Sequence, residues 1–256
     1  MWSNFHTHSL YCDGKGSPGD FVAKAGESMV SCLGFSSHAP LPFDCTWCMK
    51  SERLAAYLYE LEQLKQSQRD VAVYKSLEID FIPGVISANE FKSQLDYTLG
   101  SIHFVDAFPD GRHWEIDGPH ASFLQGLDAI FNNDIRSVIA RYFELTREMI
   151  ATACPTIVGH LDKIKIQNIG EKFFKESDSW YQKEVTRTLA LVRDAGAIVE
   201  VNTRGLYQKK SLTPYPSPWV LDLLLQYNIP VTLSSDAHHP DDLVNCFSET
   251  ASLLKK

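Results

Sequence analysis

Residues Trp2 to His8 read Trp-Ser-Asn-Phe-His-Thr-His, and this stretch decides the fold because a candidate strand ends there in two potential metal ligands. On an extended chain the side chains of residues i and i+2 point to the same face, so His6 and His8 can approach one ion. A lone His-x-His motif is weak evidence, because ordinary surface histidines produce it equally well. The argument therefore depends on whether other strand ends repeat the pattern.

Six further segments share the character of the first, being short, rich in apolar and β-branched residues, and bounded by turn formers. The seven candidate strands are Trp2–His6, Leu33–Ser37, Val71–Ile79, Tyr97–His103, Thr156–His160, Ala197–Thr203 and Pro230–Ser235. Helical periodicity fills most of the gaps, at Pro18–Met29, Glu52–Gln66, Asp134–Thr152, Trp180–Asp194, Ser217–Gln226 and near Asp241–Leu254. Val105–Phe123 is rich in Pro, Gly, Asp and His, and we expect a long loop there. The alternation predicts an α/β protein.

Residues of metal-binding type follow six of these seven strands. A single strand-end histidine is more often a hydrogen-bonded surface residue, but its recurrence indicates one cluster. The members are His6, His8, Asp13, His38, Glu78, His103, His160, Asp236 and His238. The carboxyl ends of parallel strands converge on one mouth in a closed barrel, whereas they spread along an edge in an open sheet. We therefore expect a closed barrel, with the open sheet as the alternative.

The chemistry of the cluster favours zinc, iron or manganese, because it combines imidazoles and carboxylates without a committed thiolate. Nine ligands are too many for one tetrahedral ion, and they fit two or three ions with a bridging carboxylate. Three other histidines, His113, His120 and His239, are left outside the cluster. Cys45-Thr-Trp-Cys48 is a single Cys-x-x-Cys, which fits a redox pair or half of a zinc site, but we favour incidental loop cysteines.

Composition limits the classes of function. The 256 residues are 44% apolar and 22% charged, which is typical of a globular protein with one large or two small domains. A net charge of -8 without a basic stripe argues against a nucleic-acid partner. No apolar run is long enough to span a membrane, and the start does not read as a signal peptide. We therefore expect a cytoplasmic protein with reduced thiols.

The motifs, taken in order, resemble those of the polymerase-and-histidinol-phosphatase (PHP) family. They are His6-Thr-His8, Asp13-Gly14, Ser37-His38-Ala-Pro, Leu77-Glu78, Ser101-Ile-His103-Phe, Gly159-His160-Leu-Asp and Ser235-Asp236-Ala-His238. The resemblance runs from residue 6 to residue 240. Three further segments resemble the histidinol-phosphate phosphatases more than the polymerase-attached members: Gly100–Phe104, Tyr142-Phe-Glu-Leu and Glu200-Val-Asn-Thr.

The resemblance implies one PHP-type domain over residues 1–256, folded as a distorted seven-stranded (β/α)7 TIM-like barrel with three divalent ions. One ion would take His6, His8, Glu78 and Asp236. A second would share Glu78 and take His103 and His160, and a third would take Asp13, His38 and His238. Several family members carry a histidine where this chain has Asp13, which leaves the preference of the third site open. The implied reaction is hydrolysis of a small phosphate, L-histidinol phosphate, in histidine biosynthesis.

For this reaction we expect a hydroxide that bridges the ions near Glu78 to attack phosphorus in line, because metal ions activate water and neutralise phosphoryl charge. Asp236 and His238 are candidates for protonating the leaving alkoxide. Arg204 and Lys163, both close behind strand ends, are candidates for binding the phosphate. Loop residues available to the ammonium and imidazole of the substrate are Phe43, Asp44, Asp106, Trp114 and Asp162.

Three alternatives stay open at this point. The chain could act on another small phosphomonoester, it could be an exonuclease, or it could be a metal-binding protein without catalytic activity. The acidic chain argues against the exonuclease. Activity that is lost on chelation and restored by metal would exclude the non-catalytic alternative.

Overall fold

The computed structural model describes residues 1–255, and its main feature is two parallel β-sheets. The first sheet has the order β1-β2-β3 and the second the order β10-β9-β8-β5-β4, with every pairing parallel. The strands of the first are β1 (Trp2–Asn4), β2 (Val30–Phe35) and β3 (Ala72–Lys75). Those of the second are β4 (Glu78–Asp80), β5 (Leu99–Ser101), β8 (Ile157–Val158), β9 (Ile198–Asn202) and β10 (Val231–Ser234). The expected α/β class is therefore confirmed.

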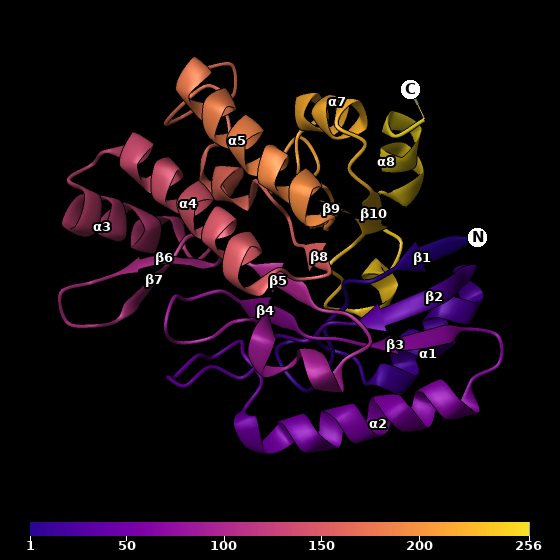
Figure 1. Cartoon of the computed structure of the whole chain (residues 1–256). Helices are drawn as coiled ribbons and strands as arrows, with labels where there is room; N and C mark the ends of the chain where they lie inside the picture. The colour runs from indigo at the N-terminus through magenta and orange to yellow at the C-terminus, as the bar shows by residue number, and fades with distance from the viewer. Residues whose placement is uncertain (256) are drawn as a thin grey trace.

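Helices surround the strands, with α2 along β3 and α4 packed against α5 (Figure 1). They are α1 (Pro18–Glu27), α2 (Leu54–Ser67), α3 (His120–Phe131), α4 (Ile135–Ala153), α5 (Ser179–Ala195), α6 (Arg204–Tyr207), α7 (Pro218–Gln226) and α8 (Phe247–Leu253). The start of α1 shows the local cause. The Ser17 hydroxyl accepts from Asp20 N, the Asp20 carboxylate accepts from Ser17 N, and Pro18 begins the first turn.

Apolar burial holds the helices against the two sheets in two clusters. In the first, Phe21 of α1 and Tyr57 and Leu61 of α2 pack with Leu33 and Phe35 of β2. In the second, one face of α4 and of α5 packs on the second sheet, through residues that include Val138, Tyr142, Val185, Leu189 and Val199. At the strand ends, apolar members of the clusters such as Ala237 and Leu161 alternate with the polar residues Asp236 and His160.

The expected seven-stranded closed barrel is not found within residues 1–255. The predicted strand Val71–Ile79 is broken, because the chain changes neighbour at Ser76 and Leu77. Ser76 N donates to Phe35 O of the first sheet at 2.8 Å, whereas Leu77 O accepts from Leu99 N of the second sheet at 3.2 Å. Two isolated parallel bridges, Thr7 to Ala237 and His38 to Glu78, are the links between the sheets.

The segment Val105–Phe123 is also more ordered than expected. It contributes to an antiparallel hairpin of β6 (Phe104–Ala107) and β7 (His113–Glu115), and α3 begins at His120. The prediction of one long loop was wrong. Polar and turn-forming residues flank β7 on both sides, so its alternating pattern of burial is too short to stand out in the sequence. In this strand Trp114 is buried, whereas His113 and Glu115 are half-buried.

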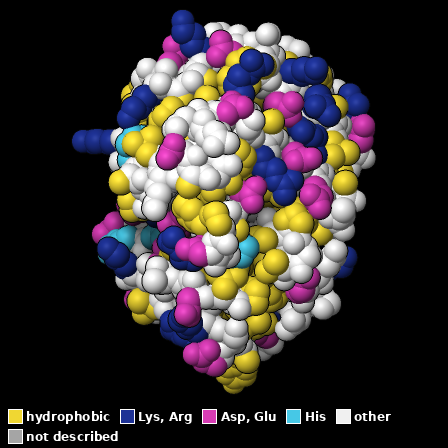
Figure 2. All heavy atoms as spheres, turned by 90° about the vertical axis from the view of Figure 1, so that its left-hand side faces the viewer, with side chains coloured by type: hydrophobic (Ala, Val, Ile, Leu, Met, Phe, Trp, Pro, Cys, Tyr) yellow, Lys and Arg dark blue, Asp and Glu magenta, His cyan; other side chains and the backbone are white. Residues whose placement is uncertain are grey.

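Two surface properties bear on the function. None of the helices in residues 1–255 is long and apolar enough to cross a membrane. On the face that Figure 2 shows, Lys and Arg side chains are interspersed with Asp and Glu and form no single basic stripe.

Candidate metal centre and catalytic site

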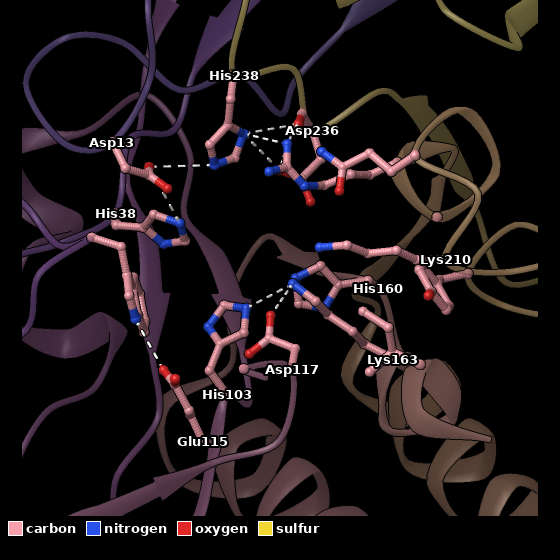
Figure 3. Close-up of a pocket in the computed structure, with 17 residues that line it drawn as sticks. Asp13, His38, His103, Glu115, Asp117, His160, Lys163, Lys210, Asp236 and His238 are labelled. Carbon is pink, nitrogen blue, oxygen red and sulfur yellow. Dashed lines mark hydrogen bonds and ion pairs between the residues drawn. The ribbon is translucent and has the colours of Figure 1, made fainter. Parts of the chain in front are cut away.

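The nine predicted ligand residues lie together at the carboxyl ends of the strands. They come from the segments after β1, β2, β5, β8 and β10 and from β4 itself, and many of them point into one cavity (Figure 3). The ring and carboxylate atoms of eight of the nine, all except His160, form three overlapping groups whose atoms lie within 4.8 Å of one another. These groups are His6, His8 and Asp236; His8, Asp13, His38 and His238; and His38, Glu78 and His103.

Asp13 reaches the cluster because the loop after β1 turns back on itself. Gly14 N donates to Ser9 O at 3.1 Å, and a Cβ on Gly14 would collide with the backbone of His8. The turn places Asp13 Oδ1 at 3.3 Å from His238 Nε2 and 3.9 Å from His38 Nε2. A glycine at position 14 is therefore what lets this carboxylate approach two histidines.

Four side chains surround one point deep in the site. His6 Nε2 lies 3.0 Å from His8 Nε2, 3.2 Å from Glu78 Oε2 and 3.6 Å from Asp236 Oδ1. His8 Nε2 lies 3.4 Å from Glu78 Oε2 and 3.2 Å from Asp236 Oδ1. Asp236 achieves this position with a left-handed backbone, at φ 54°, which non-glycine residues rarely adopt outside strained or functional positions.

Glu78 presents its two oxygens to different neighbours. Oε2 faces His6 and His8 and lies 3.1 Å from His38 Nδ1. Oε1 lies 2.9 Å from His160 Nε2 and 3.6 Å from His103 Nε2. One carboxylate thus lies between two sets of imidazoles, which is the geometry that a bridging ligand needs.

Two buried carboxylates outside the nine orient the rings. Glu200 Oε1 is 2.6 Å from His6 Nδ1, and Asp80 Oδ1 is 2.9 Å from His103 Nδ1. With a proton on Nδ1 donated outward, the Nε2 lone pair of each ring faces the cluster, as in carboxylate–histidine–metal arrangements. Sequence reasoning missed both roles. The signal was present, because Asp80 follows Glu78 at i+2 on one strand, as His8 follows His6.

The protonation states follow from burial and charge. Burial lowers the pKa of His38 to about 4 and that of His8 well below its usual value. Burial also acts to lower the pKa of His6 and of His103, but neighbouring carboxylates outweigh this effect. Glu200, Asp236 and Glu78 hold the pKa of His6 well above its usual value, and Asp80 raises that of His103 to about 9.

The site fits a group of divalent ions. Three buried side-chain atoms at its walls have no hydrogen-bond partner, namely Asp13 Oδ1, His38 Nδ1 and His160 Nδ1. Burial alone would raise the pKa of Glu78 and Asp236, but the neighbouring histidines hold both well below their usual values, so both are carboxylates. Buried ionised donors without hydrogen bonds are costly unless a cation compensates them. Imidazole and carboxylate donors suit zinc, iron or manganese.

The cavity beside the cluster has a volume of about 180 Å³ and contains both predicted phosphate-binding residues. Lys163 Nζ lies 2.9 Å from Asp117 Oδ2 and 3.2 Å from His103 Nε2. Arg204 Nη1 donates to Asp236 O at 2.6 Å and contacts His238 Nδ1. Sequence reasoning missed the other residues that line the cavity, among them Trp47, Glu115, Asp117, Lys210 and Tyr215.

The loop residues suggested for the substrate's organic end are not in this cavity lining. Trp114 is buried in the apolar core, and Asp162 is held by Lys165 at 2.8 Å. The remaining three, Phe43, Asp44 and Asp106, are also absent from the lining. Two residues that do line the cavity, Trp47 and Glu115, lie close in sequence to Asp44 and Trp114, in the loop before α2 and on β7.

The residues left outside the predicted cluster lie apart from it. His113 stacks on Phe43, His120 contacts Gln167 and Lys172, and His239 accepts from Asp241 N. The structure differs from the expectation of reduced thiols at one place, because Cys45 and Cys48 form a disulfide. The crosslink closes a short loop that contains Trp47, which is one of the residues that line the cavity.

Comparison with known proteins finds relatives that match most of the chain. A probable histidinol-phosphatase of Deinococcus radiodurans is 27% identical over 98% of this chain and 91% of its own length. A histidinol phosphatase candidate, hisK of Listeria monocytogenes, has a similar structure with TM-score 0.84 and 21% identity, covering 96% of this chain and 99% of that one.

A second solved structure is the histidinol phosphate phosphatase of Lactococcus lactis in complex with zinc, L-histidinol and phosphate. It matches with TM-score 0.70 and 17% identity over 99% of this chain and 92% of that one. At these identities the two structures establish the fold. The family model of the PHP domain matches residues 4–204, which include eight of the strands and most of the cluster. The chain therefore belongs to the PHP family.

Proposed function

We propose that this chain is a metal-dependent histidinol-phosphatase, which hydrolyses L-histidinol phosphate to L-histidinol and phosphate in histidine biosynthesis. The observation that carries the proposal is the position of Glu78, whose two oxygens face two sets of imidazoles, several of which line a cavity that also contains cationic side chains. The near full-length similarity to a probable histidinol-phosphatase supports the choice of substrate over other phosphomonoesters.

Three divalent ions would account for the donor set. The first would be held by His6, His8, Glu78 and Asp236, the second by Glu78, His103 and His160, and the third by Asp13, His38 and His238. Zinc, iron and manganese all suit these donors, and zinc is present in the Lactococcus lactis relative. Bound ions of this kind lower the pKa of water from 15.7 to about 7 and neutralise phosphoryl charge.

Arg204 and Lys163 would bind the phosphoryl oxygens. Both lie at the cavity, and both are held in place by carboxylate or carbonyl oxygens. Burial alone would lower the pKa of Lys163, but Asp117 and other carboxylates raise it, so the side chain stays cationic. A fixed cation that is already positioned stabilises the charge that develops on a transferred phosphoryl group.

His238 is suited both to bind an ion and to supply a proton. Its Nδ1 lies 3.0 Å from Asp236 O and also contacts the Arg204 guanidinium. When Nδ1 donates to the carbonyl, Nε2 carries a lone pair and acts as a ligand. When both ring nitrogens carry a proton, Nδ1 still donates to the carbonyl and Nε2 can give its proton to the leaving alkoxide, which leaves the ring neutral. Asp236, whose Oδ1 is 3.5 Å from His238 Nδ1, would stabilise the protonated ring.

We also propose that residues 1–256 act as one phosphatase domain and that its two sheets are arcs of one distorted seven-stranded barrel. The two parallel bridges between the sheets support this, because each lies where a barrel would have to close. Hydrogen bonds are present at both, since His8 N donates to Ala237 O at 2.9 Å and Ala39 N donates to Glu78 O at 2.8 Å.

The test is a comparison of substrates with the metal-loaded protein. L-histidinol phosphate should be hydrolysed at least 100-fold more efficiently than 4-nitrophenyl phosphate, measured as kcat/KM. Activity should disappear after chelation and return with zinc, manganese or iron. Equal efficiency on both substrates would refute the substrate assignment, and a fully metallated protein without esterase activity would refute catalysis.

A further inference from the structure

We infer that Glu115 is the specificity-determining residue for the cationic end of the substrate, so that this site selects phosphomonoesters that carry a protonated amine. The inference rests on the proposed function, because it names the residue that binds the ammonium group of L-histidinol phosphate, a part of the substrate that the metal cluster does not contact. It concerns a residue that lines the same cavity but takes no part in the cluster.

Glu115 has a charge that nothing in the described protein compensates. Four carboxylates line the cavity, and three of them lie close to cationic or metal-binding groups: Asp13 faces His38 and His238, Asp117 pairs with Lys163, and Asp236 faces Arg204 and His6. Among residues 1–255, Glu115 alone of the four has no ion pair. A half-buried carboxylate in a cavity, without a protein cation, is suited to pair with a cation on a ligand.

Trp47 fixes the position of this carboxylate. Its indole Nε1 donates to Glu115 Oε2 at 3.0 Å, which leaves Oε1 without a hydrogen bond in the described residues. The same indole lies edge-on against His38, with ring centroids 4.5 Å apart, and against His103, at 5.4 Å. The indole of Trp47 therefore contacts Glu115 through its nitrogen and two histidines of the cluster through its ring.

The cavity is also polarised. Its cationic residues are Lys163, Arg204 and Lys210, and Figure 3 shows Lys210 and Glu115 entering from opposite sides. A phosphate drawn to the cluster and the cations leaves the organic end of the substrate toward Trp47 and Glu115. L-histidinol phosphate has this charge distribution, because its ammonium group is on the carbon next to the phosphorylated one.

The experiment compares Glu115→Gln with the wild-type protein, both loaded with metal. The amide oxygen still accepts from Trp47 Nε1, so the variant removes the charge and keeps the contact. The KM for L-histidinol phosphate should rise about tenfold, because charge-assisted hydrogen bonds are much stronger than neutral ones, while kcat changes little. The KM for 4-nitrophenyl phosphate, which has no cation, should stay the same. Calorimetry should show that L-histidinol binds about tenfold more weakly.

A matched control is Glu144→Gln, which removes an exposed carboxylate of α4 that pairs with Arg141 far from the cavity. It should leave both KM values unchanged. If Glu115→Gln alters both substrates equally, or neither, the inference is wrong. If the variant does not fold, the wild-type protein decides the question: L-histidinol should inhibit at least tenfold better than 3-(imidazol-4-yl)propan-1-ol, which lacks the amine, and equal inhibition overturns the inference.

The two proposals fail in different ways. If the wild-type protein shows no preference for L-histidinol phosphate, the proposed function is wrong, and the pair phosphoethanolamine and ethyl phosphate then tests Glu115 by itself. A KM shift in Glu115→Gln that is confined to phosphoethanolamine would support the inference without the function. The absence of any KM shift in this variant would overturn the inference.

Discussion

Glu78 is the residue on which the proposed arrangement of ions depends, because it contacts histidines through both oxygens. In Glu78→Gln one of these oxygens becomes an NH2 group, which cannot coordinate a cation. We expect loss of metal and at least a 100-fold fall in kcat/KM, since even outer contacts of metal ligands contribute 10- to 100-fold to affinity or activity. Metal analysis after desalting, together with steady-state kinetics, measures both effects.

The control for this variant is Glu52→Gln, at an exposed glutamate in the short turn before α2. It should retain full metal content and rate. A Glu78→Gln protein with unchanged metal content and activity would show that the carboxylate does not bridge ions.

Asp80 raises the pKa of the His103 imidazole, and in the metal-free protein this should make the stability of the fold depend on pH. The folded-state pKa of His103 is about 9, above the ordinary value near 6.5 that the unfolded chain would have. This raised pKa stabilises the fold fully below about pH 6.5, and the stabilisation is lost as the pH rises through 9. Each unit of the shift corresponds to about 1.4 kcal/mol.

Urea unfolding of the chelated protein at several pH values between 6 and 10 measures this loss. Asp80→Asn removes the carboxylate that raises the pKa of His103, so its stability should vary much less over the same range. An equal pH dependence in both proteins would contradict the assignment of Asp80 as the cause.

At the scale of residues, sequence predicted the members of the cluster better than their surroundings. The strand-end rule placed His6, His38 and Asp236 together because parallel strands share one end, whatever their exact length. The residues missed, such as Glu200 and Glu115, do not follow a strand end. Their positions depend on which side chains meet across strands and loops, and spacing along the chain does not contain that information.

At the scale of elements, the strands of the two parallel sheets were predicted within a few residues, whereas the hairpin of β6 and β7 was missed and one predicted strand is divided. Val71–Ile79 reads as one apolar strand, but it divides into β3 and β4 because its two halves bond to different sheets. The hydrophobic pattern of a sequence indicates which residues are buried, and both halves of this segment contribute buried residues. It does not report which neighbour a strand pairs with, so the break could not be predicted.

The loop that carries Trp47 gives a prediction at this scale. Replacing Cys45 with serine removes the crosslink to Cys48 that encloses the indole. The free energy of unfolding should fall by at most about 2 kcal/mol, because the closed loop is short and constrains the unfolded chain little. The KM for L-histidinol phosphate should rise, because Trp47 then holds Glu115 less firmly. Unfolding and kinetics under oxidising and reducing conditions measure both effects.

Reduced wild-type protein should match Cys45→Ser, whereas Cys154→Ser, at an exposed free cysteine, should behave as the oxidised wild-type protein does. If reduction changes neither stability nor KM, the crosslink has no part in holding this wall of the cavity.

At the scale of the whole molecule, the site lies where the two sheets meet. Both bridges between the sheets involve cluster residues or their neighbours, since His38 pairs with Glu78 and Thr7 lies between His6 and His8. The two large apolar clusters hold mainly one sheet each, and a small third cluster packs Leu99 and Ile157 against Phe5 and Tyr74, so the polar site is one of two connections between the halves. Metal binding and the stability of the fold should therefore be coupled.

Chelation tests this coupling. Without ions, the carboxylates of Glu78 and Asp236 and the surrounding imidazoles remain buried at the junction of the sheets with incomplete compensation. Ions present at a thousand times their dissociation constant stabilise a fold by about 4.1 kcal/mol, and in a protein of about this size each kcal/mol shifts Tm by roughly 2–4 °C. We therefore expect Tm to fall by roughly 10 °C on chelation and to recover with zinc, but not with calcium, which prefers oxygen ligands. Glu78→Gln should have a low Tm that zinc restores poorly. If chelation abolishes activity without lowering Tm, the apolar clusters alone hold the two sheets together and the metal centre serves only the chemistry.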